Sequence, residues 1–181
     1  MAEIKSTIDI VMERTRHMVQ TPEERARERA EEREKRSRGF LLKLSGNQIE
    51  PGSLTKALSD LPDEDQAPMK TVLLRTLIEG LGFESNNPPI LAGVNVLAGE
   101  ALRAETAEAE VLFEAYKSQS EELEKDATGS VIEELAAIGV SGSALQPKGG
   151  AASGGSLAAR DLRAESESRW LALKRAMLAK V

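Results

Sequence analysis

Residues 21–38, TPEERARERAEEREKRSR, constrain the fold more than any other part of the chain, because 13 of these 18 residues are charged. A segment with so few apolar side chains can contribute little to a hydrophobic core. Alanine, glutamate, arginine and lysine nevertheless all favour the α-helix. The sequence therefore predicts a solvated, charged helix that projects from an extended helical protein and is interrupted at Gly39.

A second helix is expected just before this segment, because apolar residues recur at the spacing of one helical face over 7–20. The following Thr21-Pro22-Glu23-Glu24 has the pattern of a capping box with proline at the first helical position. The residues leave open whether the two helices are continuous. The opening MAEIKSTIDIVMERTR resembles the start of a group of small bacterial proteins of unknown function; the resemblance is confined to the N-terminal region and implies no activity.

Composition favours helices along the rest of the chain as well. Leucine and alanine dominate the apolar residues, only five residues are aromatic, and β-branched residues rarely alternate with polar ones. The sequence contains no cysteine, which excludes disulfides and thiolate chemistry. The predicted fold is therefore all-α, an elongated helical bundle.

Apolar residues at helical spacing predict the central elements. A short helix is expected over 53–61 and a core helix over 66–80, followed by the helix-breaking Asn86-Asn87-Pro88-Pro89. A long helix is expected over 91–125, and a capping box at Ser130 predicts a further short helix that Gly139 ends. The long helix carries a heptad-like stripe, typical of a coiled-coil seam, made of Leu91, Asn95, Ala98, Leu102, Glu105, Ala109, Leu112, Tyr116, Gln119 and Leu123.

The last helix, expected over 157–180, follows residues 139–156, which hold six of the chain's 14 glycines and indicate a flexible linker. Such a basic, amphipathic helix can pack on the protein's own acidic core, bind a partner or lie on an anionic membrane. The sequence leaves these three alternatives open. The apolar face consists of Leu162, Trp170, Leu173, Met177 and Val181, and the basic residues are Arg169, Lys174, Arg175 and Lys180.

Charge divides the chain into an acidic centre and mildly basic ends. Residues 1–44 carry 11 basic and 9 acidic side chains, residues 45–156 carry 7 and 18, and residues 157–181 carry 6 and 3. This layout favours docking of the ends onto the middle, or antiparallel self-association. The sequence thus predicts four parts: an N-terminal amphipathic and then charged helix (1–44), an acidic helical core (45–138), the linker (139–156) and a basic C-terminal helix (157–181).

The residues offer no recognisable catalytic constellation. The one histidine, His17, follows Glu13 by four positions and cannot supply the two Glu-x-x-His elements of a di-iron helical bundle. Lys148-Gly149-Gly150 lacks the pattern of a phosphate-binding loop, and the acidic run 63–65 lacks that of a calcium loop. We therefore expect no catalytic residue, no metal and no cofactor, and a hydrolase or metalloenzyme using Glu13 and His17 is the least favoured hypothesis.

The expected function is that of a non-catalytic interaction or assembly protein, with a protein partner or a homo-oligomer. The alternative is a peripheral protein that associates with nucleic acid or with an anionic membrane through its basic terminal helices. Six glutamates lie among the arginines of residues 21–38, and they weaken binding to nucleic acid because such binding gains from counterion release only at a net basic surface. No apolar run reaches the roughly 20 residues of a membrane span, and the start lacks a signal-peptide block, so a cytoplasmic location is expected. The interaction candidates are Leu102, Leu112, Tyr116, Trp170, Leu173, Met177, Arg169, Lys174 and Arg175.

Overall fold

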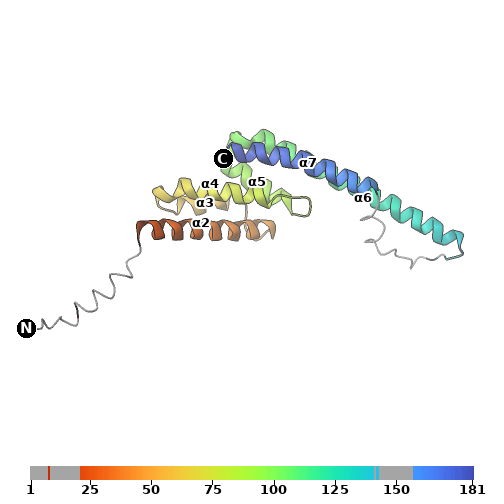
Figure 1. Cartoon of the computed structure of the whole chain (residues 1–181), viewed down its shortest axis with the longest axis horizontal. Coiled ribbons are helices and arrows are strands. Elements are labelled where there is room, and N and C mark those ends of the chain that lie inside the picture. Colours follow the sequence, from red (N-terminus) through yellow and green to blue (C-terminus); the bar gives the residue numbers. More distant parts are fainter. Residues whose placement is uncertain (1–7, 9–20, 141, 143–156) are drawn as a thin grey trace, which may run out of the picture.

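The computed structural model describes Ile8, residues 21–140, Gly142 and residues 157–181, and every regular element within them is helical. Figure 1 shows an elongated molecule, so the predicted all-α, elongated architecture is confirmed. The helix expected over 7–20 and the linker expected over 139–156 lie largely outside the described residues. In chain order the elements are α2 (Pro22–Ser45), α3 (Ser53–Ser59), α4 (Asp63–Gly80), α5 (Asn87–Ala98), the short 3₁₀ helix η2 (Gly99–Leu102), α6 (Arg103–Ala137) and α7 (Leu157–Ala179).

The charged segment begins α2, and the predicted capping box is present. The Thr21 backbone N–H donates to Glu24 Oε2 (2.8 Å), and the Glu24 N–H donates to Thr21 Oγ1 (3.2 Å). The helix does not stop at Gly39, where the sequence predicts an interruption. Continuing the helix carries Leu44 into the core, where it is fully buried, and this burial outweighs the roughly 1 kcal/mol by which glycine disfavours a helix.

Helix α2 lies along α4 and runs in the same direction. Arg33 Nη2 is 3.5 Å from Asp65 Oδ1 in the first turn of α4, and Leu41 lies against Gly80 at the last residue of α4. The short helix α3 brings the chain back so that this parallel pairing can form (Figure 1). Residues 22–32 of the charged helix are exposed, but Arg29 and Glu32 lie beside Leu61 and Asp65, so α2 runs along the main body for most of its length (Figure 1).

Helix α4 is the centre of the core, as its apolar periodicity predicts. Four of its five buried side chains, all but Met69, form one continuous cluster with Leu44 of α2, Leu54 of α3 and the apolar face of α5. The same cluster includes Trp170 of α7, so the central helices and the C-terminal helix share a single core. The buried residues of α4 are Met69, Leu73, Leu74, Leu77 and Ile78.

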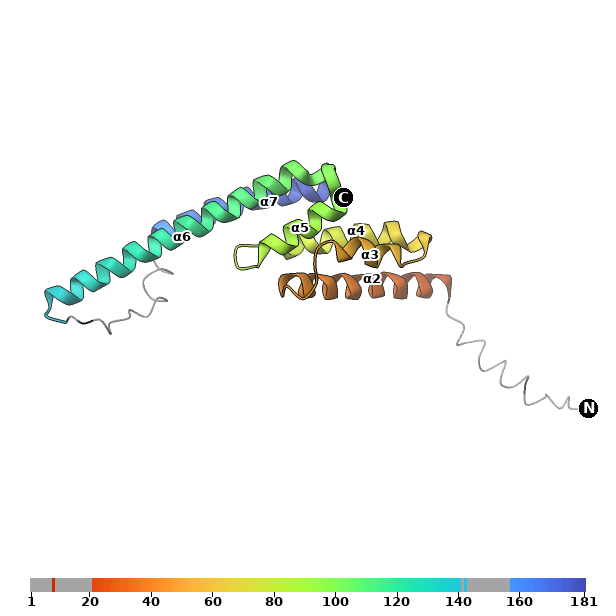
Figure 2. The ribbon, with the colours of Figure 1, turned by 180° about the vertical axis from the view of Figure 1, so that it is seen from behind.

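The predicted long helix is present with different bounds: α6 has 35 residues and begins at Arg103, not at residue 91. Between α5 and α6 the chain reverses, as both ribbon views show (Figures 1 and 2). The reversal begins at Gly99, whose φ of 60° lies in the left-handed region that side chains disfavour. Across the turn, Thr106 Oγ1 donates to Asn95 Oδ1 (2.6 Å). Because the stripe predicted over 91–125 is divided between two helices, it does not form one seam.

Helix α6 also continues through Ser130, where the sequence predicts a new helix to begin. Inside an unbroken helix the Ser130 N–H already has a carbonyl partner in the preceding turn, so no cap is needed there. The end at Gly139 is as predicted. Gly139, with φ of 83°, donates to Ala136 O (3.0 Å), and Val140 N donates to Leu135 O (2.9 Å), the two bonds of a Schellman motif.

Candidate interaction surface

Helix α7 packs antiparallel to α6 and buries its apolar face on the protein's own core. Lys180, just after α7, pairs with Glu105 in the first turn of α6, and the Trp170 and Phe113 ring centroids are 5.0 Å apart. Trp170 is 6% exposed and Met177 is fully buried. Of the three alternatives that the sequence leaves open for this helix, the structure contains the first, packing on the core.

The loop between α4 and α5 carries Phe83 to the α6–α7 pair. The Phe83 ring centroid lies 5.3 Å from that of Phe113 and 4.4 Å from that of Tyr116. Asn87 fixes the loop because its amide accepts a hydrogen bond from Gly82 N (3.1 Å) and donates one to Gly82 O (2.8 Å). From the sequence, Asn87 was interpreted only as part of a helix break. Asparagine side chains in turns often form hydrogen bonds to nearby backbone groups, and this signal could have identified its role.

Several basic side chains of α7 are paired with acceptors around it. Arg163 contacts Glu167 Oε1 (2.8 Å) and Glu84 Oε1 (3.4 Å), and the hydrogen bond to Glu167 is the main cause of its raised pKa. Lys174 Nζ donates to Glu79 O (3.4 Å). Helix α7 is thus tied to the α4–α5 region by charged as well as apolar contacts.

The pair formed by Lys180 and Glu105 closes the end of α7 onto the start of α6. The hydrogen bond from Lys180 holds the pKa of Glu105 below its ordinary value, because it favours the ionised carboxylate. The Glu105 side chain is only 15% exposed, and its Oε2 has no hydrogen-bond partner among the described residues. Lys180 therefore favours the charged form of this partly buried carboxylate.

The nine interaction candidates fall into two groups. Leu102, Trp170, Leu173 and Met177 are buried within the core. The other five are exposed or half-buried, and they do not form one surface: Leu112 and Arg169 border a groove on one face of α6–α7, whereas Tyr116 lines a pocket on another. The remaining two are Lys174, which is half-buried, and Arg175, which is exposed.

The groove between α6 and α7, called here the outer groove, has a volume of about 580 Å³. Val111 and Ala115 lie about 200° around α6 from Phe113, so they face away from the Phe83 loop. Val111 is 69% exposed and was not among the sequence candidates, because it falls outside the heptad-like stripe. The lining residues are Glu108, Val111, Leu112, Ala115, Arg169, Ala172 and Leu173.

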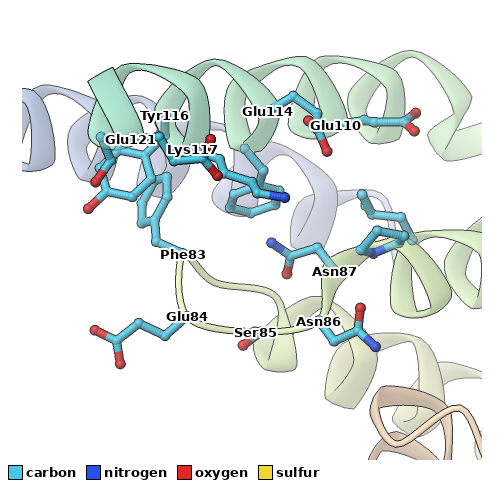
Figure 3. A pocket seen from close by; sticks show the side chains of 14 residues that line it. Phe83, Glu84, Ser85, Asn86, Asn87, Glu110, Glu114, Tyr116, Lys117 and Glu121 are labelled. Carbon is cyan, nitrogen blue, oxygen red and sulfur yellow. The ribbon is translucent and has the colours of Figure 1, made fainter. Parts of the chain in front are cut away.

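A second hollow, of about 460 Å³, lies between the α4–α5 loop and α6. Figure 3 shows Phe83 and Tyr116 at one end of it and the carboxylates of Glu110 and Glu114 on the side of α6. Lys117 is the basic residue of the lining. Within the described part of the chain, no group of three or more His, Cys, Asp or Glu side chains is arranged to hold a metal ion.

The described residues do not bear on the hydrolase hypothesis, because Glu13 and His17 lie outside them. None of the described helices is both long and apolar enough to cross a membrane. Comparison of the chain with protein-family models, with curated proteins and with solved structures gives no match.

Proposed function

We propose that this protein is a non-catalytic interaction or assembly protein that binds its partner through the outer groove of the α6–α7 hairpin. The observation that carries this proposal is the exposure of Val111, at 69%, in a groove whose floor is formed by Leu112 and Leu173. An apolar hollow with charged residues at its border has the composition of a protein-binding patch.

The groove also sits on well-supported elements. Trp170 and Phe113 pack against each other where the two helices meet, and Phe83 packs on Phe113, so the backbone that carries Val111 is held in place without a partner. A surface that is ordered before binding loses less conformational entropy on association. This favours recognition by docking over folding upon binding.

The test is a single substitution, Val111→Asp, with Ile132→Asp as the matched control. Both side chains are exposed apolar residues of α6, at 69% and 42%, but Ile132 lies outside the groove. We expect Val111→Asp to remove association, whether with itself or with a co-purifying protein, and Ile132→Asp to leave it unchanged. Circular dichroism should show equal helix content for both variants.

Two results would contradict the proposal. One is a wild-type protein that stays monomeric in size-exclusion chromatography with light scattering and binds no protein. The other is association that Val111→Asp leaves intact.

The alternative of binding to nucleic acid or to an anionic membrane has less support. A helix that lies on a membrane inserts its apolar face, and that face of α7, with Trp170, is occupied by the core. Arg163 and Lys180 already pair with acidic residues of the same chain. Titration with anionic vesicles or with DNA at low salt tests this alternative directly.

A further inference from the structure

We infer that the far end of α6 is a second interaction surface, and that it binds an amphipathic helix with basic flanks supplied by another protein. This surface, called here the distal seam, consists of Ala127, Val131, Leu135 and Ile138. It shares no residue with the outer groove, so the inference goes beyond the proposed function.

The distal seam continues the face of α6 that α7 covers. Phe113 lies on the covered face, since its ring contacts that of Trp170. Val131 follows Phe113 by 18 positions, which is about five helical turns, so the two side chains lie on the same side of α6. Leu135 and Ile138 follow Val131 by four and seven positions and extend the same stripe.

Helix α7 begins too far along the hairpin to cover this seam. The two helices are antiparallel, and Leu157, the first residue of α7, precedes Trp170 by 13 positions. Because Trp170 meets Phe113, Leu157 is level with about residue 126 of α6. Both ribbon views show α6 continuing past the start of α7 with no other described helix beside it (Figures 1 and 2). Ile138 and Leu157 are accordingly 74% and 77% exposed.

Charge around the seam selects the chemistry of its occupant. Residues 118–138 carry six acidic side chains and one basic side chain. Glu134 is exposed and lies about 60° around α6 from Val131, so it borders the seam. A second copy of the chain would bring an equally acidic end to this surface and oppose like charges. The seam is therefore complementary to a basic partner.

The covered part of the same face shows which kind of basic partner fits. Its occupant is α7, an amphipathic helix within residues 157–181, which carry six basic and three acidic side chains. Its apolar side meets α6 at Phe113, and just after it Lys180 pairs with Glu105 of α6. A helix of this composition, placed beyond the start of α7, would repeat that arrangement along the distal seam.

The length of the seam sets the strength of the complex. From Ala127 to Ile138 it spans about 16 Å, or three helical turns. Contacts of this size fall at the small end of protein interfaces, where complexes are weak and transient. Complementary charge in such complexes mainly raises the rate of association. We therefore expect binding that depends strongly on salt.

The experiment measures the fluorescence anisotropy of a labelled peptide as the full-length protein is added at low salt. The peptide has the sequence of residues 157–181, because α6 binds this basic amphipathic helix within the chain. We expect saturable binding that weakens as the salt concentration rises. A second peptide, in which the six basic residues are replaced by glutamine, should bind at least about tenfold more weakly.

Two pairs of adjacent substitutions serve as test and matched control. Val131→Asp should weaken peptide binding at least about tenfold, because it places a charge in the apolar contact. Ile132→Asp, about 100° away around α6, should leave binding unchanged. Glu134→Lys should also weaken binding, whereas Glu133→Lys, on the opposite side of the helix, makes the same change in net charge and should not. Circular dichroism checks that each variant keeps its helix content.

Three results overturn the inference. The first is the absence of saturable binding. The second is binding that Val131→Asp and Glu134→Lys leave intact, which would mean that the peptide has replaced α7 or lies elsewhere. The third is a wild-type dimer that Val131→Asp dissociates, which would make the occupant a second copy. If Val111→Asp removes peptide binding and Val131→Asp does not, the inference fails and the proposed function stands. If only the distal-seam variants act, the inference holds whatever the fate of the outer groove.

Discussion

Replacing Trp170 by alanine should remove a large part of the stability, because this side chain joins α7 to the core. It is 6% exposed and its ring lies 5.0 Å from that of Phe113. A buried aromatic side chain hides about 150–250 Å², which at about 25 cal/mol per Å² is worth about 4–6 kcal/mol. This is an upper bound, since the unfolded chain already hides part of that surface. We therefore expect Trp170→Ala to lower the free energy of unfolding by about 3–5 kcal/mol.

The measurement is urea unfolding followed by the helical circular dichroism signal, because the variant lacks the chain's single tryptophan. Leu171→Ala is the control, since Leu171 is the next residue of the same helix and is 51% exposed. Its loss should stay near 0.5 kcal/mol, the scale of surface substitutions. The native wild type should also show the blue-shifted fluorescence of a buried indole.

A loss of less than about 1 kcal/mol for Trp170→Ala, or emission typical of exposed indole in the native wild type, would refute the reasoning. Either result would mean that α7 is not docked on α6 in solution.

Three further predictions concern the loop, the helix contacts and the response to pH. Asn87→Ala should lower the free energy of unfolding by about 2–3 kcal/mol in the same urea assay, because it removes two backbone-bridging hydrogen bonds in the α4–α5 loop. Gly93→Ala should lower the free energy of unfolding by about 1–3 kcal/mol, because the new methyl group would lie 3.2 Å from buried leucine carbons. Gly39→Ala has no atom within 4 Å of its new methyl group and should stabilise α2 by up to about 1 kcal/mol. If Gly39→Ala destabilised the protein more than Gly93→Ala does, the packing described here would be contradicted. Lys180 lowers the pKa of Glu105 from 4.5, so the pair stabilises the fold above that pH, and this stabilisation is lost as the pH falls through the folded-state pKa. Lys180→Met should reduce this acid-dependent loss in a plot of unfolding free energy against pH. An unchanged plot would count against the coupling of the two residues.

The features that the sequence predicts correctly are those encoded within a few residues. The capping box at Thr21 and the Schellman end at Gly139 each depend on side chains or backbone groups no more than five positions apart. The buried face of α4 likewise follows from the helical spacing of its apolar residues. Such signals require no knowledge of what lies on the other side of the helix.

The features that the sequence does not predict depend on distant partners. Helix α2 passes through Gly39 because its last turns pack on the core, and local propensity is too weak to oppose that burial. The reversal at Gly99 divides a periodic stretch that by itself reads as one helix. Of the candidate surface, Leu112, Leu173 and Arg169 were identified and do border the outer groove. Val111 was not, because its exposure follows from how α7 sits on α6.

The 35 residues of α6 also have a mechanical consequence. The hairpin joins the α2–α5 body near one end, at the Gly99 turn and the Phe83 contacts, and α6 extends beyond the start of α7 (Figure 2). The helix is about 52 Å long, so a tilt of about 10° at its base moves its far end by about 9 Å. A small rearrangement of the aromatic contacts at Phe83 would therefore produce a large displacement at the far end of α6.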